Sequence, residues 1–425
     1  MPKMHPMDDN FAIPLLRDLF ATALRAASPM ELVPRALPPR PRGMVTVLGA
    51  GKASAAMAHA VEKAWGPPMR GLVIVPDGYG VSCRHVEIVE AAHPVPDARG
   101  LKAARRILDM ARGLGEGDFL LAPVSGGGSA LMTLPAEGVP LADKQMLSRE
   151  LLKCGATIDE INTVRRHVSA IKGGRLAEAA WPAPVLALLL SDVPGDEPSV
   201  IASGPTIPDP TTRADALAVL TRHGIAPPDS VRHWLEDPRS ETPAPGDEKL
   251  SRAAWKMIGK PAGALETVAR RARRLGLRVV NLGDRVQGEA RHVARRHALL
   301  ARRIATSGGG RPVLLLSGGE TTVTVRGRGR GGRNTEYALA LALALGGHPR
   351  IHALAADTDG IDGTTEAAGA IVRPGTLRRA RAMGLDPLRH LADNDACPFF
   401  GHLDDLLVTG PTRTNVNDFR AILIS

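Results

Sequence analysis

The stretch Asp118–Ser129, with the sequence DFLLAPVSGGGS, decides how the fold of this chain is interpreted. Its apolar part, Phe119–Val124, predicts a buried β-strand that ends at a turn. The three glycines between Ser125 and Ser129 carry no Cβ, so successive backbone N–H groups can converge on an anion. A strand, a glycine loop and a helix start are together the usual phosphate-holding arrangement of α/β proteins. By itself the loop can equally be a flexible turn. The phosphate-binding interpretation therefore requires other residues of the chain that could form a second wall of the same cleft.

Strand and helix patterns alternate on both sides of this stretch. Further apolar runs of strand length are Met44–Leu48, Leu72–Val75, Val185–Leu190, Val313–Leu316 and His352–Ala355. This alternation, broken by Gly and Pro, predicts α/β layers. A chain of 425 residues is too long for one compact core, which predicts two or three domains. The charged, Pro-rich stretch Glu236–Lys249 is the expected boundary.

The net charge of +10 raises the possibility of a nucleic-acid-binding protein. The arginines, however, are dispersed along predicted helices, as in Arg270–Arg274 and Arg291–Arg303. Aromatic residues for base stacking make up only 3% of the chain. We therefore expect no nucleic-acid partner.

The first residues, the apolar runs and the cysteines of the sequence indicate the cellular compartment in which the protein is expected. The first ten residues, MPKMHPMDDN, contain no apolar signal region, and no apolar run approaches the roughly 20 residues that span a bilayer. Cys83, Cys154 and Cys397 are far apart and odd in number, which suits a reduced compartment and gives no disulfide or metal framework. We expect a cytoplasmic protein with no membrane partner.

A second loop, Gly49–Ser54 with the sequence GAGKAS, follows a predicted strand and begins a helix. Thr46 and Ala53 stand where a P-loop requires Gly and Ser or Thr, so this is not a P-loop. Ser54 stands where a dinucleotide loop has its third glycine, and Asp77 lies too far along the chain to be the expected acid. What remains is Lys52 at a helix start, which is either a surface lysine or a positive charge for a phosphate.

Two further predicted strands end in acidic turns. These are the loops SDVPGD, with Asp192 and Asp196, and DTDGIDG, with Asp357, Asp359 and Asp362. Aspartates are common turn formers, but their oxygens can also hold Mg²⁺ or accept a proton from a hydroxyl group. Ligands bind beyond the carboxyl ends of strands in an open α/β sheet, so these loops would share one edge if the strands are parallel.

An alternating glycine–arginine run covers Arg326–Arg333. Such a run can belong to an RGG-like nucleic-acid segment. Its place inside a folded α/β pattern favours the alternative, a loop that delivers a guanidinium to a phosphoryl group. The histidines show no metal-ligand spacing.

The order of these motifs resembles the type II (two-domain) glycerate kinase family, whose C-terminal half carries the MOFRL domain and whose N-terminal half is the DUF4147 domain. The resemblance covers roughly residues 10–425. It rests on LGAGKASAAMA, AAHPVPDARG, LAPVSGGGSALM, EINTVRRHVSAIKGGRLA, LLLSDVPGDEPSVIASGPTIPD, LLLSGGETTV, GGRNTEYALALAL, AADTDGIDGTTEAAGAI and TGPTRTNVND.

This resemblance implies a set of site residues. It makes Lys52 and Arg333 the basic pair near the transferred phosphoryl group, with Asp192 and Asp359 as the carboxylates that act as metal ligand or base. It implies that Ser125, Gly126, Gly127, Gly128, Ser129, Gly318, Gly319 and Glu320 line the cleft, with Gly49, Gly51 and Asn334 beside them. Arg165 and Lys172 are the residues expected to bind the substrate carboxylate. Whether the glycine loop holds ATP phosphate or that carboxylate stays open, with nucleotide phosphate favoured.

The resemblance further implies two three-layer α/β domains with the active site in the cleft between them. We expect a Rossmann-like, mostly parallel domain over residues 1–238 and a smaller mixed α/β domain over 250–410, with the tail 411–425 packing back on the first. The implied reaction is ATP- and Mg²⁺-dependent phosphorylation of D-glycerate, typically to 2-phosphoglycerate, by a monomer or homodimer. The alternative is an NAD(P)H-dependent hydroxypyruvate reductase, a label that some relatives carry.

Overall fold

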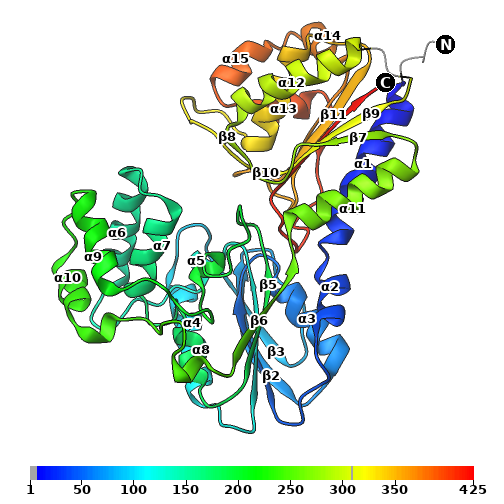
Figure 1. The fold of residues 1–425 in the computed structure, drawn as a ribbon. Coiled ribbons are helices and arrows are strands. Elements are labelled where there is room, and N and C mark those ends of the chain that lie inside the picture. The colour runs from blue at the N-terminus through cyan, green and yellow to red at the C-terminus, as the bar shows by residue number, and fades with distance from the viewer. Residues whose placement is uncertain (1–6, 308–309) are drawn as a thin grey trace. The chain divides into compact units, whose positions relative to one another are not determined.

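The computed structural model describes residues 7–307 and 310–425, which form two compact units. One unit, Pro29–Ile258, is called here the Rossmann-like unit, and the other, which joins the residues up to Ser28 with Gly259–Ser425, is called the mixed-sheet unit. Each contains its own sheet (Figure 1). Within the described residues no helix is long and apolar enough to cross a membrane.

The Rossmann-like unit is built on a six-stranded sheet in the order β3-β2-β1-β4-β5-β6. The pairs from β3 through β5 are parallel. The strands are β1 (Val45–Ala50), β2 (Met69–Pro76), β3 (Val86–Ala91), β4 (Phe119–Ser125), β5 (Val185–Leu190) and β6 (Ala253–Gly259). This order reverses direction between β1 and β4, the place where doubly wound sheets bind their ligands. The prediction of a Rossmann-like parallel sheet is confirmed.

Helices cover both faces of this sheet, with α3 and α4 on opposite sides (Figure 1). The helices are α2 (Pro29–Ala36), α3 (Ser54–Trp65), α4 (Ala98–Arg112), α5 (Gly128–Leu131), α6 (Leu141–Lys153), α7 (Ile158–His167), α8 (Arg175–Ala180), α9 (Arg213–Arg222) and α10 (Asp229–Glu236), with short 3₁₀ turns at Ile201–Ser203, Pro238–Ser240 and Glu248–Leu250. Apolar side chains of α6, α7, α9 and α10 form a separate core of their own. That helical cluster supplies one wall of the pocket described below.

The mixed-sheet unit has a six-stranded sheet in the order β13-β12-β11-β14-β9-β7. Strands β7 and β9 pair in parallel, and the other neighbouring strands of this sheet, within the described residues, pair antiparallel. The strands are β7 (Arg278–Asn281), β9 (Val313–Ser317), β11 (Ile351–Asp357), β12 (Gly369–Val372), β13 (Leu406–Leu407) and β14 (Asp418–Ile424), and β8 (Val286–Glu289) pairs separately with β10 (Gly319–Thr322). A mixed α/β second domain is therefore confirmed.

Side chains along the strands point alternately to the two faces of this sheet, so the unit has one apolar core on each face. On β9, Val313 and Leu315 pack with one set of helices, whereas Leu314 and Leu316 pack with the other. The first face is covered by α12 and α13 and the second by α1 and α11 (Figure 1). The helices are α1 (Asp9–Ala26), α11 (Pro261–Arg274), α12 (Ala290–Thr306), α13 (Arg333–Leu345), α14 (Thr376–Ala382), α15 (Pro387–Ala392) and α16 (Ala396–His402).

The expected domain limits need three corrections. Helix α1 belongs to the mixed-sheet unit, because Leu16, Leu19 and Phe20 are buried in the core of that unit; burying one such side chain stabilises a fold by about 1.5–3 kcal/mol. Strand β6 belongs to the Rossmann-like unit, where it extends the edge of the parallel sheet. The tail belongs to the mixed-sheet unit itself: β14 lies between β11 and β9 and hydrogen-bonds to both.

Candidate active site

The switch point of the Rossmann-like sheet carries the two glycine loops. Lys52 follows β1 and Ser125 ends β4, and the Lys52 N–H donates to the carbonyl oxygen of Gly126 over 2.9 Å. The Ser125 hydroxyl accepts from the N–H of Ala53 at 3.0 Å and lies 3.2 Å from the Ser54 hydroxyl. The loops GAGKAS and SGGGS are therefore joined by direct hydrogen bonds at the carboxyl ends of adjacent strands.

Glycines of both loops stand at positions that leave no room for a side chain. A Cβ on Gly126 would overlap the Asp192 carboxylate, and one on Gly51 would overlap Ser125. Gly127 has φ +79°, in the left-handed region that favours glycine, and its Cβ position lies 3.1 Å from His93 Nε2 and 3.5 Å from Lys52 Cγ. The loop is a cradle in which the side chains of Lys52, Asp192 and His93 fill the space that Cβ atoms on Gly126 and Gly127 would need.

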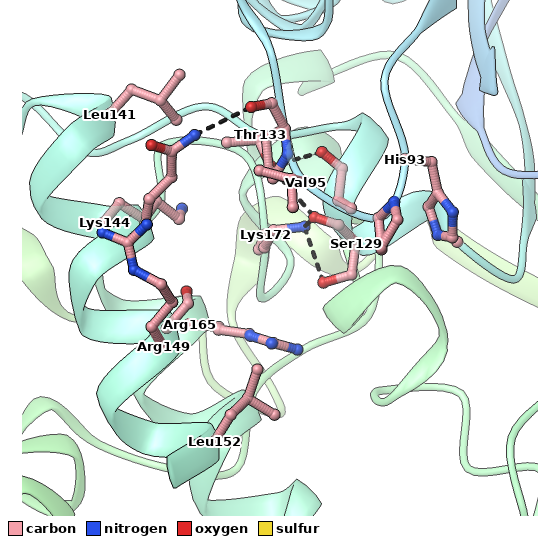
Figure 2. A pocket seen from close by; sticks show the side chains of 16 residues that line it. His93, Val95, Ser129, Thr133, Leu141, Lys144, Arg149, Leu152, Arg165 and Lys172 are labelled. Atoms are coloured by element: carbon pink, nitrogen blue, oxygen red, sulfur yellow. Dashed lines mark hydrogen bonds between the residues drawn. The ribbon is translucent and has the colours of Figure 1, made fainter. Parts of the chain in front are cut away.

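A hydrogen-bonded chain continues from this cradle. The Lys172 ammonium donates to the carbonyl oxygen of Ser129 at 2.8 Å and lies 3.4 Å from the Ser129 hydroxyl (Figure 2). The Ser129 hydroxyl lies 2.8 Å from the Ser203 hydroxyl, which donates to Asn162 Oδ1 over 3.0 Å. Because the Ser203 proton is given to Asn162, Ser129 donates to Ser203 and accepts from Lys172. In this series of hydrogen bonds, the direction of each bond is fixed by the bond next to it.

Beside Ser129 lies a pocket of about 360 Å³ whose wall combines basic and apolar side chains (Figure 2). Lys144 and Arg149 come from α6, Arg165 comes from α7, and Lys172 comes from the segment before α8. The rest of the lining includes His93, Pro94, Val95, Pro96, Gly127, Ser129, Leu141 and Leu152. Helix α7 is fixed at its start by a reciprocal capping box between Thr157 and Glu160.

Lys144 and Lys172 are buried and Arg165 is half-buried, and none of the three has an acidic partner among the described residues. Lys172 is 1% exposed and Lys144 is 6% exposed, and within residues 7–307 and 310–425 no ion pair joins either of them, or Arg165, to a carboxylate. Burial, with the charge of Arg165, lowers the pKa of Lys144 to about 7. Burial, with the charges of Lys144 and Arg165, lowers the pKa of Lys172 well below its ordinary value. Buried charges of one sign need compensation, and a bound anion supplies it.

The mixed-sheet unit holds the other predicted residues around Arg333, the first residue of α13. Its guanidinium donates to Asp418 Oδ1 at 2.7 Å, to Asp357 Oδ2 at 2.6 Å and to Glu320 Oε1 at 3.0 Å. Burial lowers the pKa of Arg333, but the three carboxylates outweigh burial and raise it. The guanidinium is thus held permanently charged in a fixed orientation.

Asn334 lies beside Arg333 and donates from Nδ2 to Asp418 Oδ1 at 2.8 Å. Its Oδ1 is buried and has no hydrogen-bond partner among the described residues. An amide oxygen with carboxylates nearby is the type of ligand that Mg²⁺ takes. The donor set in this unit therefore fits a hard cation.

The loop that follows β11 is organised by its own aspartates. Asp359 Oδ1 accepts from the N–H of Ile361 at 2.9 Å, and the N–H of Asp359 donates to Asp357. Asp362 caps α13 by accepting from the backbone N–H groups of Asn334 and Thr335. Asp357 also accepts a hydrogen bond from Arg333.

The glycine–arginine run before α13 is packed against the turn Asp393–Asp395. The backbone N–H groups of Arg326 and Gly327 donate to Asn394 Oδ1, and that of Arg328 donates to Asp393. A Cβ on Gly327 or Gly329 would overlap this turn. The glycines therefore allow a close approach of two backbone segments, as expected for a folded loop.

The predicted site residues fall into two groups. The Rossmann-like unit contains Gly49, Gly51, Lys52, Ser125, Gly126, Gly127, Gly128, Ser129, Arg165, Lys172 and Asp192, and the mixed-sheet unit contains Gly318, Gly319, Glu320, Arg333, Asn334 and Asp359. The sequence patterns did not select Lys144, His93 or Asp418, and they gave Asp357 only as one of three aspartates of its loop. The signal for Asp418 was the tail motif TNVND, whereas Lys144 lies on a helix with no distinguishing pattern.

Comparison with protein-family models agrees with this division. Residues 15–236 match the domain of unknown function DUF4147, and residues 313–418 match the MOFRL family. The fold and the site thus define a two-unit α/β protein of the DUF4147–MOFRL class.

Individual relatives narrow this class. A "D-glycerate 2-kinase" of Thermotoga maritima is 40% identical over 94% of this chain and 95% of its own length. A "Putative hydroxypyruvate reductase" of Agrobacterium vitis is 48% identical over 98% and 95%. The crystal structure of a Thermotoga maritima protein described as a glycerate kinase superposes with a TM-score of 0.87 at 39% identity, over 98% of this chain and 100% of that one. The chain belongs to the type II glycerate kinase family and is an enzyme of the kinase type.

Proposed function

We propose that this enzyme transfers the γ-phosphoryl group of ATP to the 2-hydroxyl group of D-glycerate, giving 2-phosphoglycerate and ADP. The observation that carries this proposal is the pocket beside Ser129 that is lined by the buried Lys144 and Lys172 and the half-buried Arg165, none of which has an acidic partner among the described residues. A carboxylate substrate supplies the missing negative charge. The names of the relatives from Thermotoga maritima and Pyrococcus horikoshii, both glycerate 2-kinases, support the choice of substrate and of hydroxyl group.

The nucleotide is assigned to the switch point of the Rossmann-like sheet. The amides of Gly126–Gly128 form a nest for phosphate oxygens, and Lys52 adds a positive charge next to them. Phosphoryl transfer needs little covalent chemistry from a protein, so cations placed on the phosphoryl oxygens are the main contribution. In this assignment Lys52 and Arg333 carry that role.

The family implies Mg²⁺, and such an ion fits the carboxylates and the Asn334 oxygen, which has no hydrogen-bond partner in the described part of the chain. When bound, Mg²⁺ neutralises charge on the phosphates and orients them. The metal-ligand role falls to Asp192, beside Gly126, or to Asp359, and the other is then the candidate base. Replacement of the metal ligand by Asn should raise the Mg²⁺ concentration needed for half-maximal rate. A loss of kcat at saturating Mg²⁺, with no change in that concentration, would instead assign a general base.

The competing activity is reduction of hydroxypyruvate by a nicotinamide nucleotide, as the names of the Agrobacterium vitis relatives suggest for those proteins. The sheet order suits a dinucleotide, and Asp77 directly follows β2, where an acid binds ribose in such folds. Asp77 is instead held by a two-point ion pair with Arg99, at 2.7 and 2.9 Å. The Ser54 hydroxyl also occupies the position of the third glycine and bonds to Ser125. Both observations favour the kinase.

The test incubates the purified protein with ATP, Mg²⁺ and D-glycerate and follows ADP. Enolase added to the mixture identifies the product, because it consumes 2-phosphoglycerate directly and 3-phosphoglycerate only after a mutase is added. A parallel assay supplies hydroxypyruvate with NADH or NADPH. ADP and an enolase-competent product support the proposal. A 3-phosphoglycerate product would overturn the regiochemistry, and nucleotide oxidation without ADP release would overturn the kinase activity.

A further inference from the structure

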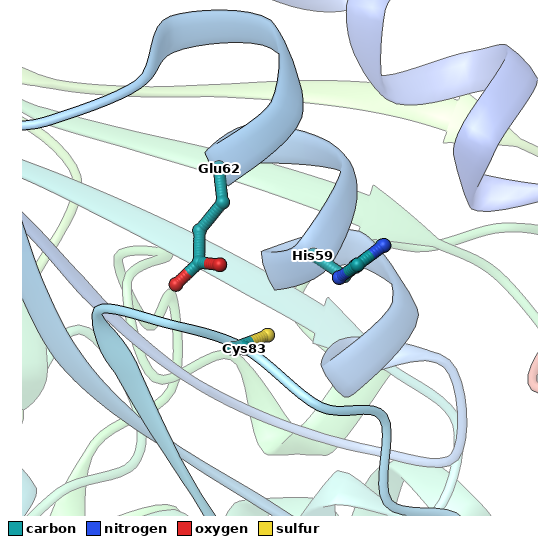
Figure 3. Close-up of side chains that lie close together, drawn as sticks. All are labelled: His59, Glu62 and Cys83. Atoms are coloured by element: carbon teal, nitrogen blue, oxygen red, sulfur yellow. The ribbon is translucent and has the colours of Figure 1, made fainter.

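Three metal-binding side chains of different kinds lie together where helix α3 meets the segment between β2 and β3. His59 and Glu62 are three residues apart on α3 and therefore share one face of that helix, and Cys83 comes from the facing segment (Figure 3). One ligand atom from each lies within 4.8 Å of the other two. All three side chains are half-buried, so an ion from solvent can reach them.

Glu62 fixes the segment that carries Cys83. Its carboxylate accepts the backbone N–H groups of Arg84 at 2.9 Å, His85 at 2.7 Å and Val86 at 2.9 Å. A carboxylate has about four acceptor positions, so one remains, on Oε2, the oxygen that receives only Arg84. The helix and the segment are thereby held in register, and the remaining position is available to a cation.

His59 is also held in place. Its Nδ1 lies 2.9 Å from the carbonyl oxygen of Ser82, and because a carbonyl can only accept, Nδ1 is the protonated nitrogen. Either ring nitrogen can serve as a ligand. Nε2 carries the lone pair in this tautomer, and Nδ1 becomes a ligand when its proton moves to Nε2 through solvent and its hydrogen bond to Ser82 breaks. The imidazole needs no large movement to join Glu62 and Cys83.

The electrostatics of the cluster favour a divalent cation. Burial and the Glu62 charge raise the pKa of the Cys83 thiol to about 12. A divalent ion reverses this effect, since thiolate and carboxylate together balance its charge, and binding releases a proton. Thiolate, imidazole and carboxylate are together the ligand types of zinc. Zinc bonds of about 2.0–2.3 Å require these side chains to close by about 1 Å, which rotation of Cys83 and Glu62 can supply.

We propose that His59, Glu62 and Cys83 form a Zn²⁺ site, completed by a water molecule, that ties α3 to the segment between β2 and β3. No motif spacing indicates it, because Cys83 reaches the helix only through the fold. The site is independent of the proposed kinase activity, so it can be tested on the protein without substrates.

The test uses a Cys154→Ser background, which removes an exposed thiol elsewhere. Titration with Cd²⁺ should produce one thiolate charge-transfer band in the ultraviolet per chain, and Zn²⁺ should abolish it by competition. Cys83→Ser should eliminate the band, and His59→Ala should weaken binding at least tenfold. His85→Ala, an exposed neighbour outside the cluster, should leave binding unchanged.

Two further measurements guard against misfolded variants. Zn²⁺ should raise the thermal midpoint of the background protein but not of Cys83→Ser, and the metal-free midpoints of the two should agree within a few degrees. Zn²⁺ should also slow alkylation of Cys83 at least tenfold. The proposal is overturned if no band forms, if the band survives Cys83→Ser, or if His59→Ala binds as tightly as the background protein.

Discussion

The Nε atom of Arg333 lies 2.7 Å from Oδ1 of Asp418, although 85 residues separate them along the chain. Asp418 is fully buried and also accepts from Arg420 and from Asn334 Nδ2. Burial would raise the pKa of Asp418, but the charges of Arg420 and Arg333 outweigh it and keep the carboxyl ionised. Arg333 therefore does not swing freely, and its guanidinium is oriented before any ligand arrives.

This orientation makes Arg333 a sensitive position. Arg333→Gln should lower kcat by about 10³-fold, because a guanidinium placed on a transferring phosphoryl group contributes at least that much. Arg333→Lys should recover only part of the rate, since an ammonium lacks the planar fork by which the guanidinium meets Asp418, Asp357 and Glu320 in fixed directions. Steady-state kinetics and thermal unfolding of both variants check this. Equal kcat in Lys and wild-type enzymes would contradict the role.

Lys52→Ala should lower kcat by about 10²–10³-fold with little change in stability, because Lys52 is assigned to nucleotide phosphate. Lys102→Ala, at an exposed position on α4, is the matched control and should retain full activity. If Lys52→Ala lost stability and activity to the same extent, the lysine would be structural.

Lys172→Met should act mainly on substrate binding. Removing a charge-assisted contact of about 1.5–3 kcal/mol should raise the KM for D-glycerate by about 10–100-fold and leave the KM for ATP unchanged. Lys153→Met, on the exposed face of α6, provides the control. A rise in the KM for ATP alone would place the nucleotide, rather than glycerate, in the pocket.

Lys144 should make stability depend on pH. Its pKa is about 7 in the folded protein and about 10.4 when unfolded, so between these values the unfolded chain binds more protons. Stability should therefore rise with pH between about pH 7 and 10, with at most about 5 kcal/mol from this group. Lys144→Met should flatten that part of the profile in urea unfolding. An unchanged slope would mean that Lys144 titrates normally.

Gly127→Ala and Gly138→Ala form a matched pair. Their φ angles are +79° and +74°, but a Cβ on Gly138 meets nothing within 4 Å, whereas one on Gly127 approaches His93 and Lys52. Both variants should lose about 1 kcal/mol of stability from the backbone. Only Gly127→Ala should also lose activity, by at least tenfold in kcat/KM. Similar kinetics for both would show that the cradle tolerates a methyl group.

The sequence predicted the parts of the site that follow from local pattern. The strand Phe119–Ser125 with its glycine loop, and Lys52 after β1, lie where an α/β interpretation expects them. Lys144 and Asp418 could not be found in this way. Lys144 reaches the pocket through the packing of α6 on α7, and Asp418 meets Arg333 only because β14 inserts between β11 and β9. Such contacts depend on long-range pairing, which no local periodicity reports.

The assignment of domains failed at both ends of the chain for a related reason. The spacing of apolar residues in α1 predicts a helix but does not indicate which of the two sheets this helix covers. Likewise, the apolar run of β14 is consistent with an edge or a central strand. Strand β14 becomes a central strand because it pairs with both β11 and β9, and this pairing depends on the tertiary structure.

The central place of β14 has a consequence for synthesis on the ribosome. The Rossmann-like unit is one continuous segment, Pro29–Ile258, and can complete its sheet while the rest of the chain is still being translated. The mixed-sheet unit cannot, because β11 and β9 have no common neighbour until β14 emerges. Helix α1 is made first but has to wait for the face that it covers. The sheet face that α1 covers is therefore incomplete until β14 has been made, and apolar surface that β14 covers, such as that of Phe20 against Phe419, stays exposed until then.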